Sequence, residues 1–242
     1  MGTASQFDGI LKEELNIHAA WIPVTNTFTV GDFGLVSGGV LVKAGNVSAD
    51  FGISFQQAAG PPSILNFTSK GTKTFRVAGG AQVNAFPNAP NVNAKLSIEF
   101  TSASSFLAKA NLAVSEMQNV AAVAKKLVET PDWKRKYIVI SAIYTGKQCA
   151  IISTKSANAK IELSGTANAL QQFDLGAVAA NLEVSDKKDI GLDIVGEDGV
   201  VGLALFKLPW GWGNDPKTLG DGEVKVAKST DADWPKILPD DM

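Results

Sequence analysis

Residues 92–101 read VNAKLSIEFT, a stretch in which apolar and polar side chains alternate without a break. Because successive side chains of a β-strand point to opposite faces of its sheet, this alternation predicts a strand with one apolar and one polar side. Such a strand is typical of an antiparallel sheet that buries one face and exposes the other. The apolar side consists of Val92, Ala94, Leu96, Ile98 and Phe100.

Three further stretches of similar length repeat the pattern, at residues 75–85, 160–168 and 176–185. A loop rich in Pro and Asn, residues 86–91, precedes 92–101 and predicts that 75–85 and 92–101 pair antiparallel. We interpret 160–168 and 176–185 as a second pair. Its apolar side includes Ile161, Leu163, Val178, Ala180 and Leu182.

Between the two pairs the hydrophobic period changes to that of a helix. The periodic stretch predicts a helix over 115–129, opened by a capping box of Ser115 and Gln118 and ended by Pro131. A shorter amphipathic helix is predicted over residues 6–17, near the N-terminus.

The rest of the chain up to residue 208 favours further strands. They are predicted within the Gly-rich region 27–55 and at 136–145, 148–155, 190–195 and 200–208. Gly146-Lys147 and Glu197-Asp198-Gly199 are interpreted as hairpin turns between neighbouring strands. The predicted fold class is therefore α+β: a twisted, largely antiparallel sheet with two or three packed helices.

Composition excludes the commonest functional classes. The chain has 242 residues, of which 45% are hydrophobic, and a formal charge of −2, so it is too apolar to be disordered and too weakly charged for non-specific nucleic-acid binding. The single histidine, His18, and the single cysteine, Cys149, exclude His-rich and Cys-rich metal sites. Phosphate-binding glycine motifs and a Gly-x-Ser-x-Gly elbow are absent from the sequence. We therefore expect no cofactor, no metal and no catalysis. Catalytic turnover that is abolished by His18→Ala would instead support the hypothesis of an enzyme.

The first 15 residues lack the pattern of a secretory signal, and no apolar run is long enough for a membrane-spanning helix, so a cytoplasmic location is expected. Residues 1–208 form the predicted domain, with a net charge of +1, whereas residues 209–242 form an acidic tail with a net charge of −3. Tryptophans in such a tail indicate docking onto the domain, with contact at a membrane interface as the alternative for the first two. They are Trp210, Trp212 and Trp234.

The order of these elements resembles the pore-forming domain of the gasdermin family, particularly its short bacterial and fungal members. The helix and strand of residues 127–144 and the closing run 201–208 carry most of the likeness, which extends over about 1–208. The resemblance implies a soluble monomer that oligomerises in membranes, where two hairpins refold into transmembrane strands. It also implies roles in cell death and defence, and activation by a protease that removes an inhibitory C-terminal part. The acidic tail is either that inhibitory part or an ordinary C-terminal wrap.

The four alternating stretches have the length that a membrane β-strand needs, about 9–11 residues. Their apolar rows are therefore the candidates for insertion into lipid. The basic cluster Lys134-Arg135-Lys136 is either a solvated junction between helix and strand or a contact for acidic lipid head groups. The chain departs from the family in two respects: residues 1–6 contain no cysteine for lipidation, and the domain is only weakly basic. The alternative function is a soluble, non-catalytic binding or scaffold module with the same fold. Alternation alone does not distinguish this function from pore formation, because a soluble sheet with one buried face shows the same pattern.

Overall fold

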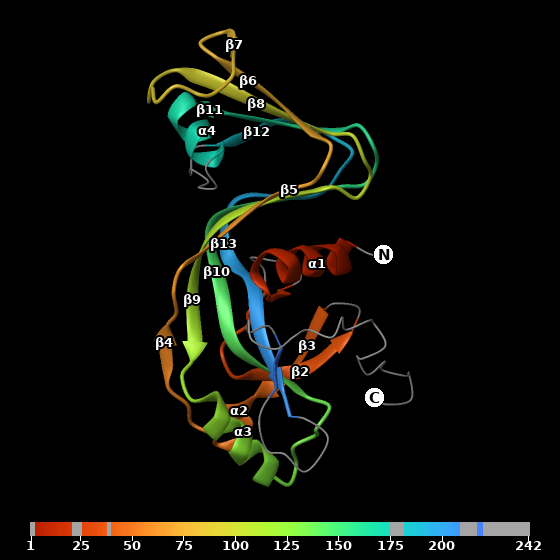
Figure 1. The fold of residues 1–242 in the computed structure, drawn as a ribbon, viewed down its shortest axis with the longest axis vertical. Coiled ribbons are helices and arrows are strands. Elements are labelled where there is room, and N and C mark those ends of the chain that lie inside the picture. The colour runs from red at the N-terminus through yellow and green to blue at the C-terminus, as the bar shows by residue number, and fades with distance from the viewer. Residues whose placement is uncertain (1–2, 21–25, 38–39, 175–181, 209–216, 220–242) are drawn as a thin grey trace. The chain divides into compact units, whose positions relative to one another are not determined.

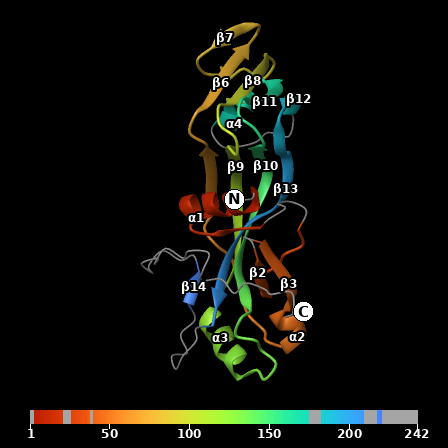
Figure 2. The same ribbon diagram turned by 90° about the vertical axis from the view of Figure 1, so that its right-hand side faces the viewer.

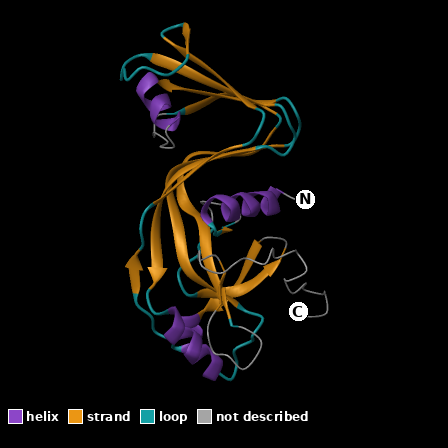
Figure 3. Cartoon of the chain, viewed as in Figure 1, coloured by secondary structure: helices purple, strands orange, loops and turns teal. Residues whose placement is uncertain are grey.

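The computed structural model describes residues 3–20, 26–37, 40–174, 182–208 and 217–219. The chain divides into two compact units. Unit 1 comprises Met1–Pro61, Val114–Thr145 and Val200–Met242, and unit 2 comprises Pro62–Ala113 and Gly146–Gly199. Among the described residues strands outnumber helices, and Figure 3 shows the strands in orange.

The helices and strands follow one another in this order. Unit 1 contains α1 (Thr3–Leu15), β1 (His18–Ala19), β2 (Asp32–Ser37), β3 (Val40–Asn46), α2 (Val47–Phe51), β4 (Gln57–Ala59), α3 (Val120–Glu129) and β14 (Lys217–Leu219). Unit 2 contains β5 (Ser63–Thr68), β6 (Thr72–Ala78), β7 (Ala81–Val83), β8 (Asn93–Phe100), β11 (Ala159–Thr166), α4 (Ala167–Asp174) and β12 (Glu183–Lys188). Three long strands contribute residues to both units: β9 (Phe106–Met117), β10 (Ile138–Thr154) and β13 (Ile190–Lys207).

In unit 1 the strands run in the order β1-β13-β10-β2-β3, and the pairs with a defined register are antiparallel. The helices α2 and α3 lie at the same end of this unit in both views (Figures 1 and 2). The helix α1 buries Phe7 and Leu11 completely. The predicted helix over 6–17 is therefore present, although it begins and ends earlier in the chain.

Unit 2 holds a five-stranded sheet of order β12-β11-β8-β6-β7, and α4 packs against it through β8 and β11 (Figure 1). The apolar row of β8 is buried, because Leu96, Ile98 and Phe100 all belong to the core of this unit. The strand β8 pairs antiparallel with β6 on one side and with β11 on the other. The predicted α+β class, with largely antiparallel sheets, is confirmed, and the described residues form four helices.

Residues 75–85 do not form one strand, as the alternation had predicted. The strand β6 ends at Ala78, and the chain turns through Gly79 and Gly80 into β7. Both glycines have positive φ angles, 58° and 82°, which is the backbone that a two-residue turn between antiparallel strands requires. Alternation was misleading here because glycine fits either side of a strand pattern.

The second predicted pair also differs from the expectation. The strand β11 ends at Thr166, whose hydroxyl oxygen accepts a hydrogen bond from the N–H of Ala169 at 3.2 Å and so caps α4. Residues 167 and 168 therefore begin a helix. The partner strand β12 starts at Glu183 and pairs antiparallel with β11, whereas residues 175–181 lie outside the described part of the chain.

Two predicted turns lie inside continuous strands. Gly146-Lys147 falls within β10, and Glu197-Asp198-Gly199 falls within β13. Positive φ angles at Gln148 (51°) and Gly196 (82°) make these positions irregular without ending either strand. The N–H of Gln148 donates to Oδ1 of Asp198 at 2.6 Å, so polar turn-forming residues here satisfy the backbone inside strands.

The predicted capping box is wrong, because Ser115 lies in β9 and α3 begins at Val120. The Ser115 hydroxyl instead accepts a hydrogen bond from Nε2 of Gln57 at 2.8 Å, across the β4–β9 pair. Asn119 stands at the N-cap position without a capping hydrogen bond from its side chain. Its Oδ1 accepts from the N–H of Gln56 at 3.2 Å, so this side chain bonds to the residue before β4 instead of capping α3.

Candidate functional site

Unit 2 consists of two continuous segments of chain. We call residues 62–113 the first excursion and residues 146–199 the second excursion. The first contributes β6, β7 and β8 to the five-stranded sheet, and the second contributes β11 and β12. The second excursion also contains the helix α4. Because both contain the alternating stretches singled out in the sequence, this unit is the candidate functional site.

A ladder of eight residue pairs between β8 and β11 joins the two excursions, from Asn93↔Thr166 to Phe100↔Ala159. Within it Leu96 lies opposite Leu163, and Ile98 lies opposite Ile161. The predicted insertion residues of the two excursions thus form adjacent rows on one face of a single sheet. Those that the structure buries are Ala94, Leu96, Ile98, Phe100, Ile161, Leu163 and Leu182.

Val92 is half-buried and packs at the edge of the same core. Val178 and Ala180, the remaining candidates of the second pair, lie outside the described residues. Contact of any of these rows with lipid stays a prediction, because burial in a folded core is the arrangement that a water-soluble sheet also requires.

The opposite face of the sheet carries mixed charges, together with the exposed side chains of Phe75 and Val77, which lie opposite Ser97 and Lys95. The apolar row predicted for the start of 75–85 is therefore on this exposed face and not in the core. The register places Lys73 opposite Glu99, and Glu99 opposite Lys160. The Nζ atom of Lys160 lies 3.2 Å from Oε1 of Glu162 on the same strand. Since opposite charges alternate across this face, it has little attraction for an anionic membrane surface.

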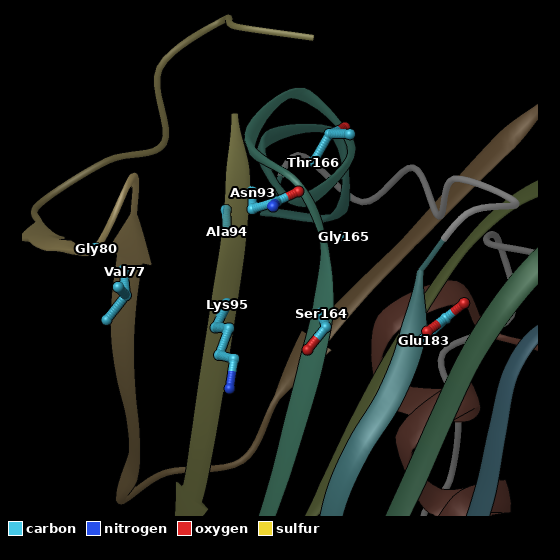
Figure 4. A pocket seen from close by; sticks show the side chains of 9 residues that line it. All are labelled: Val77, Gly80, Asn93, Ala94, Lys95, Ser164, Gly165, Thr166 and Glu183. Carbon is cyan, nitrogen blue, oxygen red and sulfur yellow. The ribbon is translucent and has the colours of Figure 1, made fainter. Parts of the chain in front are cut away.

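An open depression of about 570 Å³ lies at one end of this sheet. Figure 4 shows side chains from β6, β8, β11 and β12 around it. The register places Ser164 of β11 opposite Lys95 of β8 on one side and opposite Glu183 of β12 on the other. Its lining is Val77, Gly80, Asn93, Ala94, Lys95, Ser164, Gly165, Thr166 and Glu183. These groups offer hydrogen bonds, but they do not include a histidine or cysteine for nucleophilic or acid–base chemistry.

A second cavity of about 260 Å³ brings together Arg76, Lys109 and Asp174. Arg76 of β6 holds the carboxylate of Asp174 with two nitrogens: Nε is 2.7 Å from Oδ2, and Nη2 is 3.2 Å from Oδ1. The Nζ atom of Lys109 donates to Oδ1 of Asn66 at 2.9 Å and to the main-chain carbonyl of Asp174 at 3.2 Å. Burial lowers the pKa of Lys109, while the Asp174 carboxylate acts to raise it and the Arg76 cation to lower it further.

Sequence reasoning missed this cluster. Arg76 and Asp174 are 98 residues apart, and neither belongs to a motif. Lys109 did leave a signal, because it is the one charged residue within the apolar run 106–114. A lysine flanked on both sides by apolar residues in a strand is a sign of a buried cation with partners elsewhere in the fold.

The basic cluster Lys134-Arg135-Lys136 lies between α3 and β10, in unit 1. Both predicted roles of this cluster, a solvated junction or a contact for lipid head groups, stay predictions. The preceding Trp133 is buried among aromatic rings, with centroid distances of 5.3 Å to Phe33, 5.7 Å to Phe51 and 5.4 Å to Tyr137. The docking tryptophans Trp210, Trp212 and Trp234 lie outside the described residues.

The two residues with the most reactive side-chain types occupy structural positions. Cys149 in β10 is completely buried, and burial raises the pKa of its thiol to about 12. Nδ1 of His18 lies 3.3 Å from Oδ1 of Asp8, a carboxylate that also accepts from the N–H of Ala19 at 2.9 Å. Within the described ranges, no group of three or more His, Cys, Asp or Glu side chains is arranged to hold a metal ion.

Comparisons with known proteins complete this description. No family model matches the chain, and no curated protein matches it. A solved structure described as a bacterial gasdermin from Bradyrhizobium tropiciagri is similar, with 14% sequence identity, a TM-score of 0.39 and coverage of 88% of this chain and 90% of that chain. It comes from the family that the sequence layout resembles. A similarity at this level assigns neither an activity nor a residue role. Among the described residues, no helix is both long and apolar enough to cross a membrane.

Proposed function

We propose that this chain is a gasdermin-like protein that permeabilises membranes by forming an oligomeric pore. In the resting state it is a soluble monomer in the cytoplasm. In the active state the two excursions refold into transmembrane hairpins, after cleavage of the inhibitory tail 209–242. The observation that carries the proposal is the construction of unit 2 from two continuous excursions, each with antiparallel or alternating strands.

The lengths of the strands support this conversion. Each excursion adjoins strands long enough to extend into a hairpin, because β9, β10 and β13 hold 12, 17 and 18 residues. A membrane strand takes about 9–11 residues, so these strands are already long enough to supply membrane-spanning segments. The polar outer face and apolar inner face of β8 and β11 match the alternation that separates lumen from lipid in a barrel.

The helix α4 has to unfold in this conversion, because it occupies part of the predicted strand 160–168 and the residues after it. With eight residues it is too short to be stable alone, so its packing against the sheet maintains it. Ala169, Leu170 and Phe173 supply that packing, and all three are buried. Release of α4 would expose the inner rows of β8 and β11, which are the surfaces proposed to meet lipid.

The proposal is tested by dye release from vesicles, both anionic and neutral, comparing residues 1–242 with residues 1–208. Circular dichroism establishes first that the shorter chain is folded. We expect release by the shorter chain and silence from the full chain. Release by both would place the control outside the tail. A folded 1–208 that binds neither type of vesicle would contradict the proposal.

A second candidate function is a soluble binding module that never inserts. The open depression on the exposed face of the sheet favours it, because Asn93, Lys95 and Ser164 present hydrogen-bonding groups there without any refolding. This reading predicts a stable partner and no dependence on lipid. Silence from both forms in the vesicle assay would select it.

A further inference from the structure

The last residue of α4 contacts the first excursion through its charge. Asp174 ends the helix, where the helix dipole disfavours a carboxylate. Arg76 compensates for this by holding both carboxylate oxygens, a two-point geometry that Arg adopts with carboxylates more effectively than Lys. Arg76 and Asp174 are 24% and 26% exposed, so solvent screens the pair only in part.

Lys109 adds a second cation, which contacts the main chain of the same residue. It is 6% exposed, and its Nζ lies 5.3 Å from the centre of the Phe173 ring, on the turn of α4 that Asp174 closes. Its bond to the Asp174 carbonyl satisfies a group at the helix C-terminus that lacks a partner within the helix. Both cations therefore come from the first excursion, and both act on the end of the helix in the second.

The negative charge of Asp174 offsets the electrostatic repulsion between Arg76 and Lys109. Arg76 and Lys109 line one cavity of about 260 Å³ and repel each other, whereas the carboxylate attracts both. Loss of the carboxylate would leave two like charges facing each other, one of them buried. Loss of Arg76 would leave one cation and one anion, which is a milder change. The cluster is thus asymmetric, with Asp174 as the group on which it depends.

We infer that Asp174, Arg76 and Lys109 form an electrostatic latch that fixes the end of α4 to the first excursion and sets the rate at which the second excursion opens. The inference rests on the proposed function only for what opening leads to, since the latch itself is a property of the resting protein. While the latch is closed, α4 covers the inner rows of β8 and β11. Opening it frees the helix to unfold.

The latch is tested in the full chain, without membranes, by hydrogen–deuterium exchange of the α4 amides. Asp174→Asn should speed exchange across residues 167–174 by about tenfold, and Arg76→Gln should speed it less. The double variant should exchange more slowly than Asp174→Asn alone, because removing Arg76 relieves the repulsion of Lys109. The control is Lys160→Gln, which removes an ion pair of similar exposure within the second excursion and should leave α4 exchange unchanged.

Unchanged exchange in Asp174→Asn would overturn the latch. So would a double variant that exchanges faster than Asp174→Asn, because the two changes would then act as independent losses of stability. Circular dichroism before each measurement checks that the variants are folded. If Asp174→Asn does not fold, the comparison of Arg76→Gln with Lys160→Gln decides the matter by itself.

The effect on opening is measured in a full chain with a protease site inserted at residues 209–216, cut in the presence of vesicles of phosphatidylcholine and phosphatidylglycerol. We expect Asp174→Asn to release dye about tenfold faster than the parent after cutting. Equal rates, with a parent that leaks, would show that the latch does not control opening. Vesicles that stay intact with every variant, the parent included, would contradict the proposed function, and the exchange data would then judge the latch alone.

Discussion

The carboxylate of Asp8 in α1 accepts a hydrogen bond from the main-chain N–H of Ala19 in β1, at 2.9 Å, and ties the N-terminal helix to the edge of the sheet in unit 1. The same carboxylate lies 2.6 Å from Nζ of Lys12 and 3.3 Å from Nδ1 of His18. It is buried, and burial alone would raise its pKa. The hydrogen bonds and charges of His18 and Lys12 outweigh burial, so the pKa of Asp8 lies below its usual value of 3.8.

A depressed pKa in the folded state means that Asp8 stabilises the protein at pH values above about 4. This stabilisation is lost as the pH falls below 3.8 and through the lower pKa of the folded state. Replacing Asp8 by Asn should reduce the free energy of unfolding at pH 7 by about 2–4 kcal/mol, because the buried ionic partner is removed. Urea denaturation at pH 7 and pH 3 measures this, and the difference between Asp8→Asn and the parent should shrink at the lower pH. A constant difference would contradict the linkage.

Replacement by Ala should have opposite effects on stability at two glycines, Gly80 in the turn between β6 and β7 and Gly9 in α1. Gly80→Ala should destabilise the protein by about 1 kcal/mol, because φ is 82° there and a side chain is strained in that conformation. Gly9→Ala, at an open position inside α1, should stabilise it by about 0.5–1 kcal/mol. Thermal unfolding of the two variants gives the sign directly. Equal shifts in Tm would mean that the turn does not form as described.

The proposed unfolding of α4 predicts that helix propensity controls release. Gln172 is exposed in the last turn of this helix, so its replacement changes propensity with little change in packing. Gln172→Ile should favour extended backbone, and Gln172→Ala should favour helix, with a difference of about 0.4 kcal/mol between the two. Dye release after cleavage should be faster for Gln172→Ile by about twofold. The reverse order of rates would argue against an unfolding step at α4.

Cys149 should be inert in the native protein. Because burial raises the pKa of its thiol to about 12, almost none of it is thiolate at pH 8. A water-soluble disulfide reagent should label less than one-tenth of the protein in the time that fully labels it in 6 M guanidinium. Rapid labelling of the native chain would mean that β10 opens readily at this residue.

The sequence predicted strands best where their alternation was unbroken by glycine. In β8 every second residue is apolar and buried, so period and structure agree. The prediction of a single strand over 75–85 was wrong because Gly79 and Gly80 are compatible with a strand pattern and with a turn alike. The stretch 160–168 failed at its end because the Thr166 hydroxyl caps a helix, a contact that depends on how the following residues pack.

The candidate site could be predicted only in part, for a related reason. The apolar rows of β8 and β11 follow from local alternation, which is visible directly in the sequence. The cluster of Arg76, Lys109 and Asp174 depends on three elements that meet through long-range pairing, and its ion pair spans 98 residues. Local patterns contain no information about such a meeting, whereas a charge inside an apolar run, such as Lys109, at least marks one member.

The charged run at the end of β12 sets a boundary on any hydrocarbon-crossing segment of the second excursion. Asp186, Lys187 and Lys188 are consecutive, so they occupy both sides of the strand whichever register it takes. A lysine facing the lipid midplane costs about 2–4 kcal/mol in a membrane barrel, and shifting the strand by one residue only exchanges which lysine is exposed to that cost. In the proposed pore, the segment of this strand that crosses the hydrocarbon core therefore has to end before Asp186. The three charged residues then lie at the membrane–water interface, where the strand leaves the hydrocarbon core among the phosphates and glycerols of the lipids.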